Sequence, residues 1–165
     1  LVTLLEEVPV DAARFLFNSY EANTRIDFDL DLAVQQDSQN PVYYVQYAHA
    51  RICSILKNLA SDGITPRKCT GEELALLTAP EELELIRYLS SYTGEVTAAA
   101  KALDPAKITK YVMNLSPLFH KFYNACRVKG TDEALTAARL YLCTATRTVL
   151  ENGLELFKVT APESM

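Results

Sequence analysis

The sequence predicts an all-α protein, a bundle of helices formed by one domain of 165 residues. Three observations predict this class. Apolar residues recur every three or four positions in most segments, which is the spacing of one helix face. Residues that cap or begin helices precede those segments, as at Asn40-Pro41 and Asp104-Pro105. Because 49% of the residues are apolar, a chain of this length can bury a sizeable core.

The first forty residues predict one helix and one extended segment. The helix runs from Val10 to Tyr20 and follows Pro9, which a helix tolerates near its start. Residues 26–32, IDFDLDL, alternate apolar and acidic side chains with a period of two. That alternation predicts a short extended segment, the one strand-like stretch of the chain, which leads into residues 33–36.

Local signals then place a helix over 41–61, with Asn40 as its cap and Asp62-Gly63 after its end. Thr70 and Glu73 form a capping-box pattern ahead of the apolar LALL sequence. Another helix begins at Pro80, and we expect Thr93-Gly94 to end it.

Asp104-Pro105 begins a long helix that continues to Cys126, with Pro117 as the place for a kink. Thr131-Asp132-Glu133 begins the last helix, and Gly153 is expected to stop it. In the tail, we expect Leu154, Leu156 and Phe157 to anchor the chain, which leaves residues 161–165 free to curl toward the tyrosine-bearing face of the helix over 41–61.

Charge is spread unevenly along the chain. The net charge of −5 argues against a general nucleic-acid coat. Residues 1–40 hold two basic and eight acidic residues, a net charge of −6, whereas residues 101–130 hold six basic residues and one acidic residue. The sequence therefore has an acidic front, a nearly neutral body and one basic segment.

No pattern in the sequence predicts a bound metal or a membrane. The four cysteines lack CxxC pairing and a histidine at zinc-ligand spacing, which is typical of reduced thiols in a cytoplasmic protein. The DxDxD spacing of residues 27–31 resembles the start of a calcium loop, but Leu32 and Ser38 occupy its glycine and glutamate positions. No apolar run approaches the roughly 20 residues that a membrane span needs.

The expected helix 41–61 has one apolar face and another face that carries aromatic and basic side chains. Its inward stripe follows 3–4 spacing and consists of Val42, Val45, His49, Ile52, Leu56 and Leu59. Tyr44, Tyr47 and Arg51 stand at i, i+3 and i+7 and gather on another face. Two flat rings and a guanidinium are what a platform for unpaired bases requires.

Packing gives a simpler interpretation of the same residues. The tyrosines can pack on a neighbouring helix with their hydroxyls in water, and the spacing by itself favours this role over base stacking. His49 lies on the apolar stripe, which favours a hydrogen-bonded core histidine over a catalytic base or a ligand.

A second cluster, FHKFYNACRVK at residues 119–129, again interleaves aromatic and basic residues. Tyr123 and Arg127 stand at i and i+4, near Lys121 and Lys129. This composition suits single-stranded RNA loops, although a solvated basic face over a core of phenylalanines would look the same.

Several motifs resemble one family. VDAARF (10–15) is similar to the D-A-L-R motif of a family of anticodon-binding domains, with Ala13 in place of leucine. DFDLDLA (27–33) and NPVYYVQYAHAR (40–51) resemble the version found in arginyl-tRNA synthetases. FYNACRV, TAARL and the terminal Pro162 to Met165 fit the same family, so the resemblance covers nearly the whole chain.

This resemblance implies a helical bundle of the class I aminoacyl-tRNA synthetase anticodon-binding type, which grips the anticodon loop of arginine tRNA. The family's anticodon contacts fall on Tyr44, Tyr47, Arg51, Tyr123, Arg127 and Met165. Position 127 is often aromatic in relatives, and Arg127 can stack on a base or bind phosphate. Asp11 and Arg14 are expected to have a structural role at the joint with a catalytic domain.

The resemblance also implies a division of labour. Residues 1–40 would form a junction after the catalytic domain, and residues 41–165 the anticodon-binding domain. The sequence lacks HIGH-like and KMSK-like motifs and starts at Leu1, so we expect a fragment that catalyses nothing alone. Its parent would join arginine to tRNA using ATP and magnesium, whereas this part would need no cofactor and act as a cytoplasmic monomer without DNA or membrane partners.

Two other functions remain open from the residues themselves. One is a helical protein–protein interaction module with the tyrosine face as its hot spot. The other is a small enzyme that uses His49 or His120 with a cysteine nucleophile, for which a thiol of lowered pKa beside a histidine would be the mark.

Overall fold

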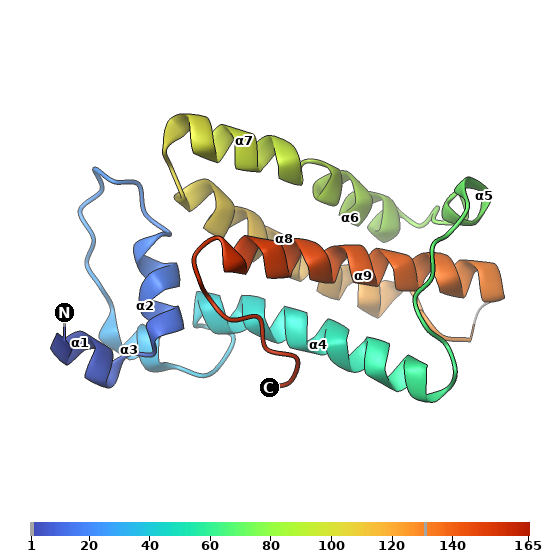
Figure 1. Ribbon diagram of the computed structural model, residues 1–165, viewed down its shortest axis with the longest axis horizontal. Coiled ribbons are helices and arrows are strands. Elements are labelled where there is room, and N and C mark those ends of the chain that lie inside the picture. The colour runs from blue at the N-terminus through green and yellow to red at the C-terminus, as the bar shows by residue number, and fades with distance from the viewer. Residues whose placement is uncertain (1, 131) are drawn as a thin grey trace.

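The computed structural model describes residues 2–130 and 132–165, and every regular element within them is a helix (Figure 1). The all-α prediction is confirmed. Leu1 and Thr131, which the sequence analysis placed at the chain start and at the start of the last helix, lie outside the described residues. The helices are α1 (Val2–Glu7), α2 (Val10–Phe17), α3 (Leu30–Val34), α4 (Pro41–Ser61), α5 (Gly71–Leu74), α6 (Pro80–Ser90), α7 (Tyr92–Ala102), α8 (Ala106–Ala125) and α9 (Glu133–Glu155).

Three long helices, α4, α8 and α9, form the centre of the bundle (Figure 1). Helices α6 and α7 pack along α8, and α2 packs on α4 near its N-terminal end. Fully buried side chains from these helices share one core, among them Phe15, Ile52, Leu85, Phe119 and Leu150. No described helix is long and apolar enough to cross a membrane.

Helix α4 begins and ends where the sequence predicted. The Asn40 side chain accepts a hydrogen bond from the Val42 N–H at 3.2 Å and donates to the Gln35 carbonyl at 2.8 Å. All six residues of the predicted inward stripe are buried. The capping box of Thr70 and Glu73 is also confirmed, although α5 is only four residues long.

The extended segment predicted at residues 26–32 is wrong. Asp29 accepts a hydrogen bond from the Leu32 N–H at 2.9 Å and caps α3, which begins at Leu30. An alternating segment forms a strand when another strand pairs with it, and the described residues offer none. A side-chain cap is the local alternative for such a segment.

Two glycines expected to end helices lie inside helices. Gly94 stands in the first turn of α7, after α6 has ended at Ser90. Gly153 is buried within α9, and a Cβ atom there would lie 2.4 Å from the Val112 side chain of α8. Gly153 is therefore required for the close approach of two helices rather than for a helix end.

Two further bounds differ from the prediction. Helix α2 ends at Phe17 rather than Tyr20, and α8 ends at Ala125 with Cys126 as its cap. Helix α8 continues through Pro117.

Candidate nucleic-acid interface

Helices α4 and α8 bring aromatic side chains together at one surface. The rings of Tyr44 and Tyr47 lie near the His120 ring, with centroid distances of 5.7 and 6.1 Å. Tyr47 is 42% exposed, whereas Tyr44 is half-buried and burial raises its pKa. The shared face predicted for the two tyrosines is thus present, and it contacts a neighbouring helix while part of it stays open.

Arg51 and Tyr123 extend this surface. The Arg51 Cζ lies 5.1 Å from the centroid of the Tyr123 ring, a cation–π arrangement. Tyr123 also stacks on the fully buried Phe119, with centroids 6.1 Å apart and ring planes at 24°. We call Tyr44, Tyr47, Arg51, His120 and Tyr123 the aromatic platform.

His120 is a member of the platform that the sequence analysis did not assign. Its Nδ1 is buried and has no hydrogen-bond partner. Burial lowers the pKa of His120, and the nearby charge of Arg51 lowers it further. The imidazole is therefore neutral at pH 7 and packs as a ring. Its i, i+3 spacing to Tyr123 places both residues on one side of α8, but only the packing of α8 on α4 brings His120 to Tyr44 and Tyr47.

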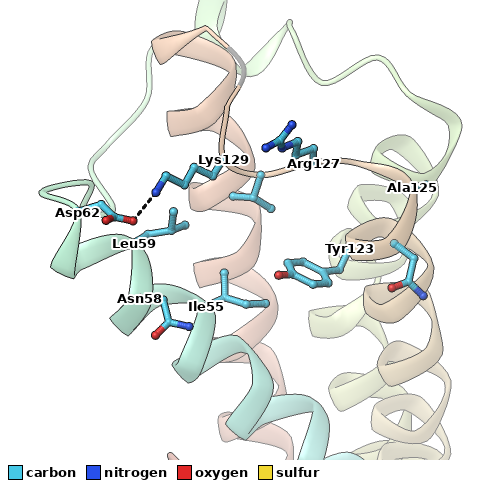
Figure 2. A pocket seen from close by; sticks show the side chains of 10 residues that line it. Ile55, Asn58, Leu59, Asp62, Tyr123, Ala125, Arg127 and Lys129 are labelled. Atoms are coloured by element: carbon cyan, nitrogen blue, oxygen red, sulfur yellow. Dashed lines mark hydrogen bonds and ion pairs between the residues drawn. The ribbon is translucent and has the colours of Figure 1, made fainter.

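A pocket of about 570 Å³ lies beside the platform, between the C-terminal ends of α4 and α8 and the loop 126–130 (Figure 2). Tyr123 points across it toward Ile55, and Lys129 reaches Asp62 at the end of α4, with an Nζ–Oδ2 distance of 2.5 Å. Its lining combines apolar, amide and basic side chains: Ile55, Asn58, Leu59, Asp62, Tyr123, Asn124, Ala125, Arg127, Val128 and Lys129.

The amides of Asn58 and Asn124 were also missed by the sequence analysis. Each side-chain amide carries hydrogen-bond donors and an acceptor, which are the groups that pair with base edges. Nothing in their local sequence pattern marks them, since only the packing of α4 against α8 places both beside one pocket.

Arg127 is exposed, and its backbone is held from beneath. The Arg127 carbonyl accepts a hydrogen bond from Arg139 Nη1 at 2.7 Å. Arg139 Nε in turn donates to Glu82 Oε1 at 2.6 Å, and Glu82 is 1% exposed. The other Glu82 oxygen accepts from the Ala79 N–H, so this buried carboxylate is fully paired.

Met165 lies apart from the other five predicted residues. It is 52% exposed and lines a second pocket of about 540 Å³ with Val10, Tyr43 and Gln46. Tyr43 also lines a smaller cavity with Ser38, Tyr44 and Tyr47. The structure therefore brings Tyr44, Tyr47, Arg51, Tyr123 and Arg127 to one continuous surface, with Met165 beyond Tyr43.

The two lysines of the basic cluster are both engaged. Lys121 pairs with Glu84 of α6 at 2.7 Å and so points away from the pocket. Lys129 is held by Asp62. Of the basic residues in 119–129, the guanidinium of Arg127 is the one left to face a ligand at the pocket rim.

The small-enzyme alternative requires a thiol of lowered pKa beside a histidine, and the Cys53–His49 pair does not provide one. His49 is buried, as predicted, and its Nδ1 donates to the Pro162 carbonyl at 2.8 Å. Cys53 Sγ lies 3.8 Å from that nitrogen, yet burial raises the pKa of the Cys53 thiol. A thiol with a raised pKa is mostly protonated and is a poor nucleophile.

Within residues 2–130 and 132–165, no group of three or more His, Cys, Asp or Glu could hold a metal ion.

A family model described as the DALR anticodon binding domain matches residues 45–165. The chain is 52% identical over all 165 residues to an arginine–tRNA ligase of Ruminiclostridium cellulolyticum, and it covers 29% of that protein. It is also 52% identical over 162 residues to the arginine–tRNA ligase of Caldanaerobacter subterraneus, again covering 29%. The chain thus spans less than a third of the length of these curated relatives.

Solved structures show the same likeness. The arginyl-tRNA synthetase of Thermus thermophilus matches with a TM-score of 0.79 and 29% identity, over 94% of this chain and 26% of that one. That of Plasmodium falciparum matches with a TM-score of 0.75 over 99% of this chain and 28% of its own, and its 22% identity shows the fold alone.

Proposed function

The chain belongs to the DALR anticodon-binding domain family, and on that premise we propose that the aromatic platform and the adjoining pocket hold the anticodon loop of arginine tRNA. Tyr44, Tyr47 and Tyr123 would stack on unpaired bases. Arg51 would contact the anticodon loop and hold the Tyr123 ring in place, and Arg127 would stack on a base or bind phosphate at the pocket rim. Met165 would add a contact from the C-terminal tail.

The observation that supports this proposal most directly is the meeting of Arg51 with Tyr123 beside the pocket. Helices α4 and α8 present half-exposed rings here, and the pocket next to them offers amides and a guanidinium. RNA loops expose bases whose faces stack on rings and whose edges pair with amides. Each stacked base contributes roughly 1–3 kcal/mol, so a few contacts give useful affinity.

The remaining parts of the proposal follow from the relatives. In a protein of their length, this chain would supply tRNA recognition, and another region would join arginine to tRNA using ATP and magnesium. We assign no residue of this chain to that chemistry. Residues 1–40 would form the junction, residues 41–165 the recognition domain, and the protein would act as a monomer in the cytoplasm.

The test is a titration of this chain with arginine tRNA and with the same tRNA carrying a changed middle anticodon base. The two RNAs share one backbone, so phosphate contacts contribute equally and the difference reports base recognition. We expect tighter binding of the unchanged tRNA, and affinity for both should fall as salt rises. Equal affinity for the two RNAs would overturn anticodon recognition, and the absence of salt-dependent binding to either RNA would favour the protein–protein module.

A further inference from the structure

Asp11, the first residue of the DAAR sequence, binds the C-terminal tail. Its Oδ2 accepts hydrogen bonds from the Thr160 N–H at 3.1 Å and from the Thr160 hydroxyl. The same oxygen accepts from Gln46 Nε2 of α4 at 3.0 Å. Gln46 also donates to the Thr160 carbonyl at 2.9 Å. One carboxylate therefore joins α2, α4 and the tail.

Arg14, the last residue of the same sequence, holds the tail two residues earlier. Its Nη1 donates to the Lys158 carbonyl at 2.7 Å. Between these two attachments, Val159 is buried at 3% exposure. On the other side, the Pro162 carbonyl accepts from His49 Nδ1. Residues 158–162 are thus fixed along α2 and α4, where Figure 1 shows the tail passing over α4. We call these contacts the tail clasp.

Two expectations about the tail are each wrong in part. Leu156 is 56% exposed and does not anchor it, whereas Leu154 is buried and Phe157 packs edge-on against Phe15. Ala161 and Pro162 are not free, since both are partly buried and Pro162 is bonded to His49.

The clasp limits where Met165 can reach. Three residues follow Pro162, and three residues of extended chain span at most about 10 Å. The Met165 side chain therefore stays near the groove that it lines with Val10 and Tyr43. Tyr43 borders the small cavity that Tyr44 and Tyr47 line, so this groove adjoins the aromatic platform.

We propose that Asp11 and Arg14 are positioning residues for tRNA recognition, which hold the tail so that Met165 contacts the anticodon loop at the Tyr43 edge of the platform. This proposal rests on the proposed function. A flexible, polarizable thioether can pack against a base ring from this position without strict geometry. Without the clasp, the tail would have to be ordered on binding, and that ordering lowers affinity.

The first measurement needs no tRNA. The chain has two methionines, Met113 and Met165, so methyl-labelled methionine gives two resolvable NMR signals. In Asp11→Ala, the Met165 methyl signal should move to the position of an unfolded chain while the Met113 signal stays unchanged. Asp31→Ala is the matched control, because Asp31 is an exposed acid in the first turn of α3 just as Asp11 lies in the first turn of α2. An unmoved Met165 signal in Asp11→Ala would overturn the positioning role.

The second measurement is a cycle of tRNA affinities, corrected for the folded fraction by circular dichroism. Removing residues 163–165 makes Pro162 the last residue, and an oxygen of its terminal carboxylate can still accept the hydrogen bond from His49. This deletion should weaken arginine-tRNA binding about 2- to 10-fold, the range expected for one sulfur–ring contact. Asp11→Ala should weaken binding to a similar extent in the full chain and add nothing in the shortened one. Thr160→Val, which keeps the side-chain shape, is the milder variant if Asp11→Ala fails to fold.

The outcomes separate this proposal from the one on which it rests. Equal losses from Asp11→Ala with and without residues 163–165 would show that the clasp acts on folding or charge, not through Met165. If the deletion has no effect while Tyr47→Ala weakens binding, Met165 makes no contact and this proposal falls alone. If neither change affects binding, the proposed function itself fails.

Discussion

The guanidinium of Arg51 lies over the ring of Tyr123, with Cζ 5.1 Å from the ring centroid. Arg51 belongs to α4 and Tyr123 to α8, so the contact joins the two helices at the middle of the platform. Side chains that are ordered before a ligand arrives lose less entropy when it binds. The Arg51–Tyr123 part of the platform is therefore preorganised to bind a flat ligand such as a base.

Tyr47 offers the cleanest test of base stacking. Tyr47→Ala should weaken arginine-tRNA binding about 5- to 150-fold, the range expected for one stacked base. Because Tyr47 is 42% exposed, the change should affect folding little. Tyr141 of α9 is the control, since it is 40% exposed and lines none of the platform pockets described above. If Tyr47→Ala and Tyr141→Ala weaken arginine-tRNA binding equally, Tyr47 makes no specific stacking contact.

Arg127 can be assigned to phosphate or base by its salt dependence. For a single-stranded loop, each phosphate contact contributes about −0.7 to the slope of log affinity against log salt. If Arg127 binds phosphate, Arg127→Ala should reduce the steepness of that slope by about this amount and weaken both anticodon variants alike. A stacking role predicts an unchanged slope and a larger loss for the unchanged anticodon. We expect the phosphate result, because the Arg127 side chain is exposed at the pocket rim.

Gly153 should tolerate no side chain. Gly153→Ala places a Cβ 2.4 Å from Val112 Cγ1, where α9 packs on α8, so the free energy of unfolding should fall by roughly 1–3 kcal/mol. Gly94→Ala in α7 meets nothing within 4 Å and should instead stabilise the protein by roughly 0.5–1 kcal/mol. Denaturant melts check both. Val112 is fully buried, so Val112→Ala lowers stability by itself. If Val112→Ala costs as much stability in Gly153→Ala as it does in the unchanged protein, the steric explanation is contradicted.

Glu73 predicts an acid-dependent contribution to stability. The Glu73 carboxylate accepts hydrogen bonds from the Arg67 side chain and from the Thr70 N–H, and these lower its pKa from 4.5 to about 2. Because the folded state holds this carboxylate ionised, its contribution is present above the unfolded pKa and is lost as pH falls from about 4.5 toward 2. Glu73→Gln should therefore lower the melting temperature at pH 7, and the difference should shrink below pH 4. A difference that stays constant down to pH 2.5 would assign the effect to shape, not charge.

Local signals predicted a good part of this fold. The start of α4 follows from Asn40 and Pro41 and its end from Asp62-Gly63, and all of these signals act within a few residues. The role of Gly153 could not be predicted, because it depends on Val112 of another helix. The helix at Leu30 was missed for a related reason, since the alternating pattern fits a strand only if a partner strand exists.

The candidate site likewise has features that local sequence predicted and features that depend on how the helices pack. Spacing placed Tyr44, Tyr47 and Arg51 on one face, because a helix repeats at fixed intervals. That His120 joins them is decided by how α8 packs on α4, which no single segment encodes. The sequence resemblance named Arg127, but the buried pair of Glu82 and Arg139 that supports its backbone becomes visible only in three dimensions.

The tail clasp also has a consequence for the order of folding. Asp11 and Thr160 are 149 positions apart, so their contact closes a very long loop. Such contacts form late, because the loop-closure entropy must be offset by contacts that are already made. During synthesis the Asp11 carboxylate would remain solvated until residue 160 had been added. Substitutions in the clasp should therefore speed unfolding and leave the folding rate of the bundle nearly unchanged.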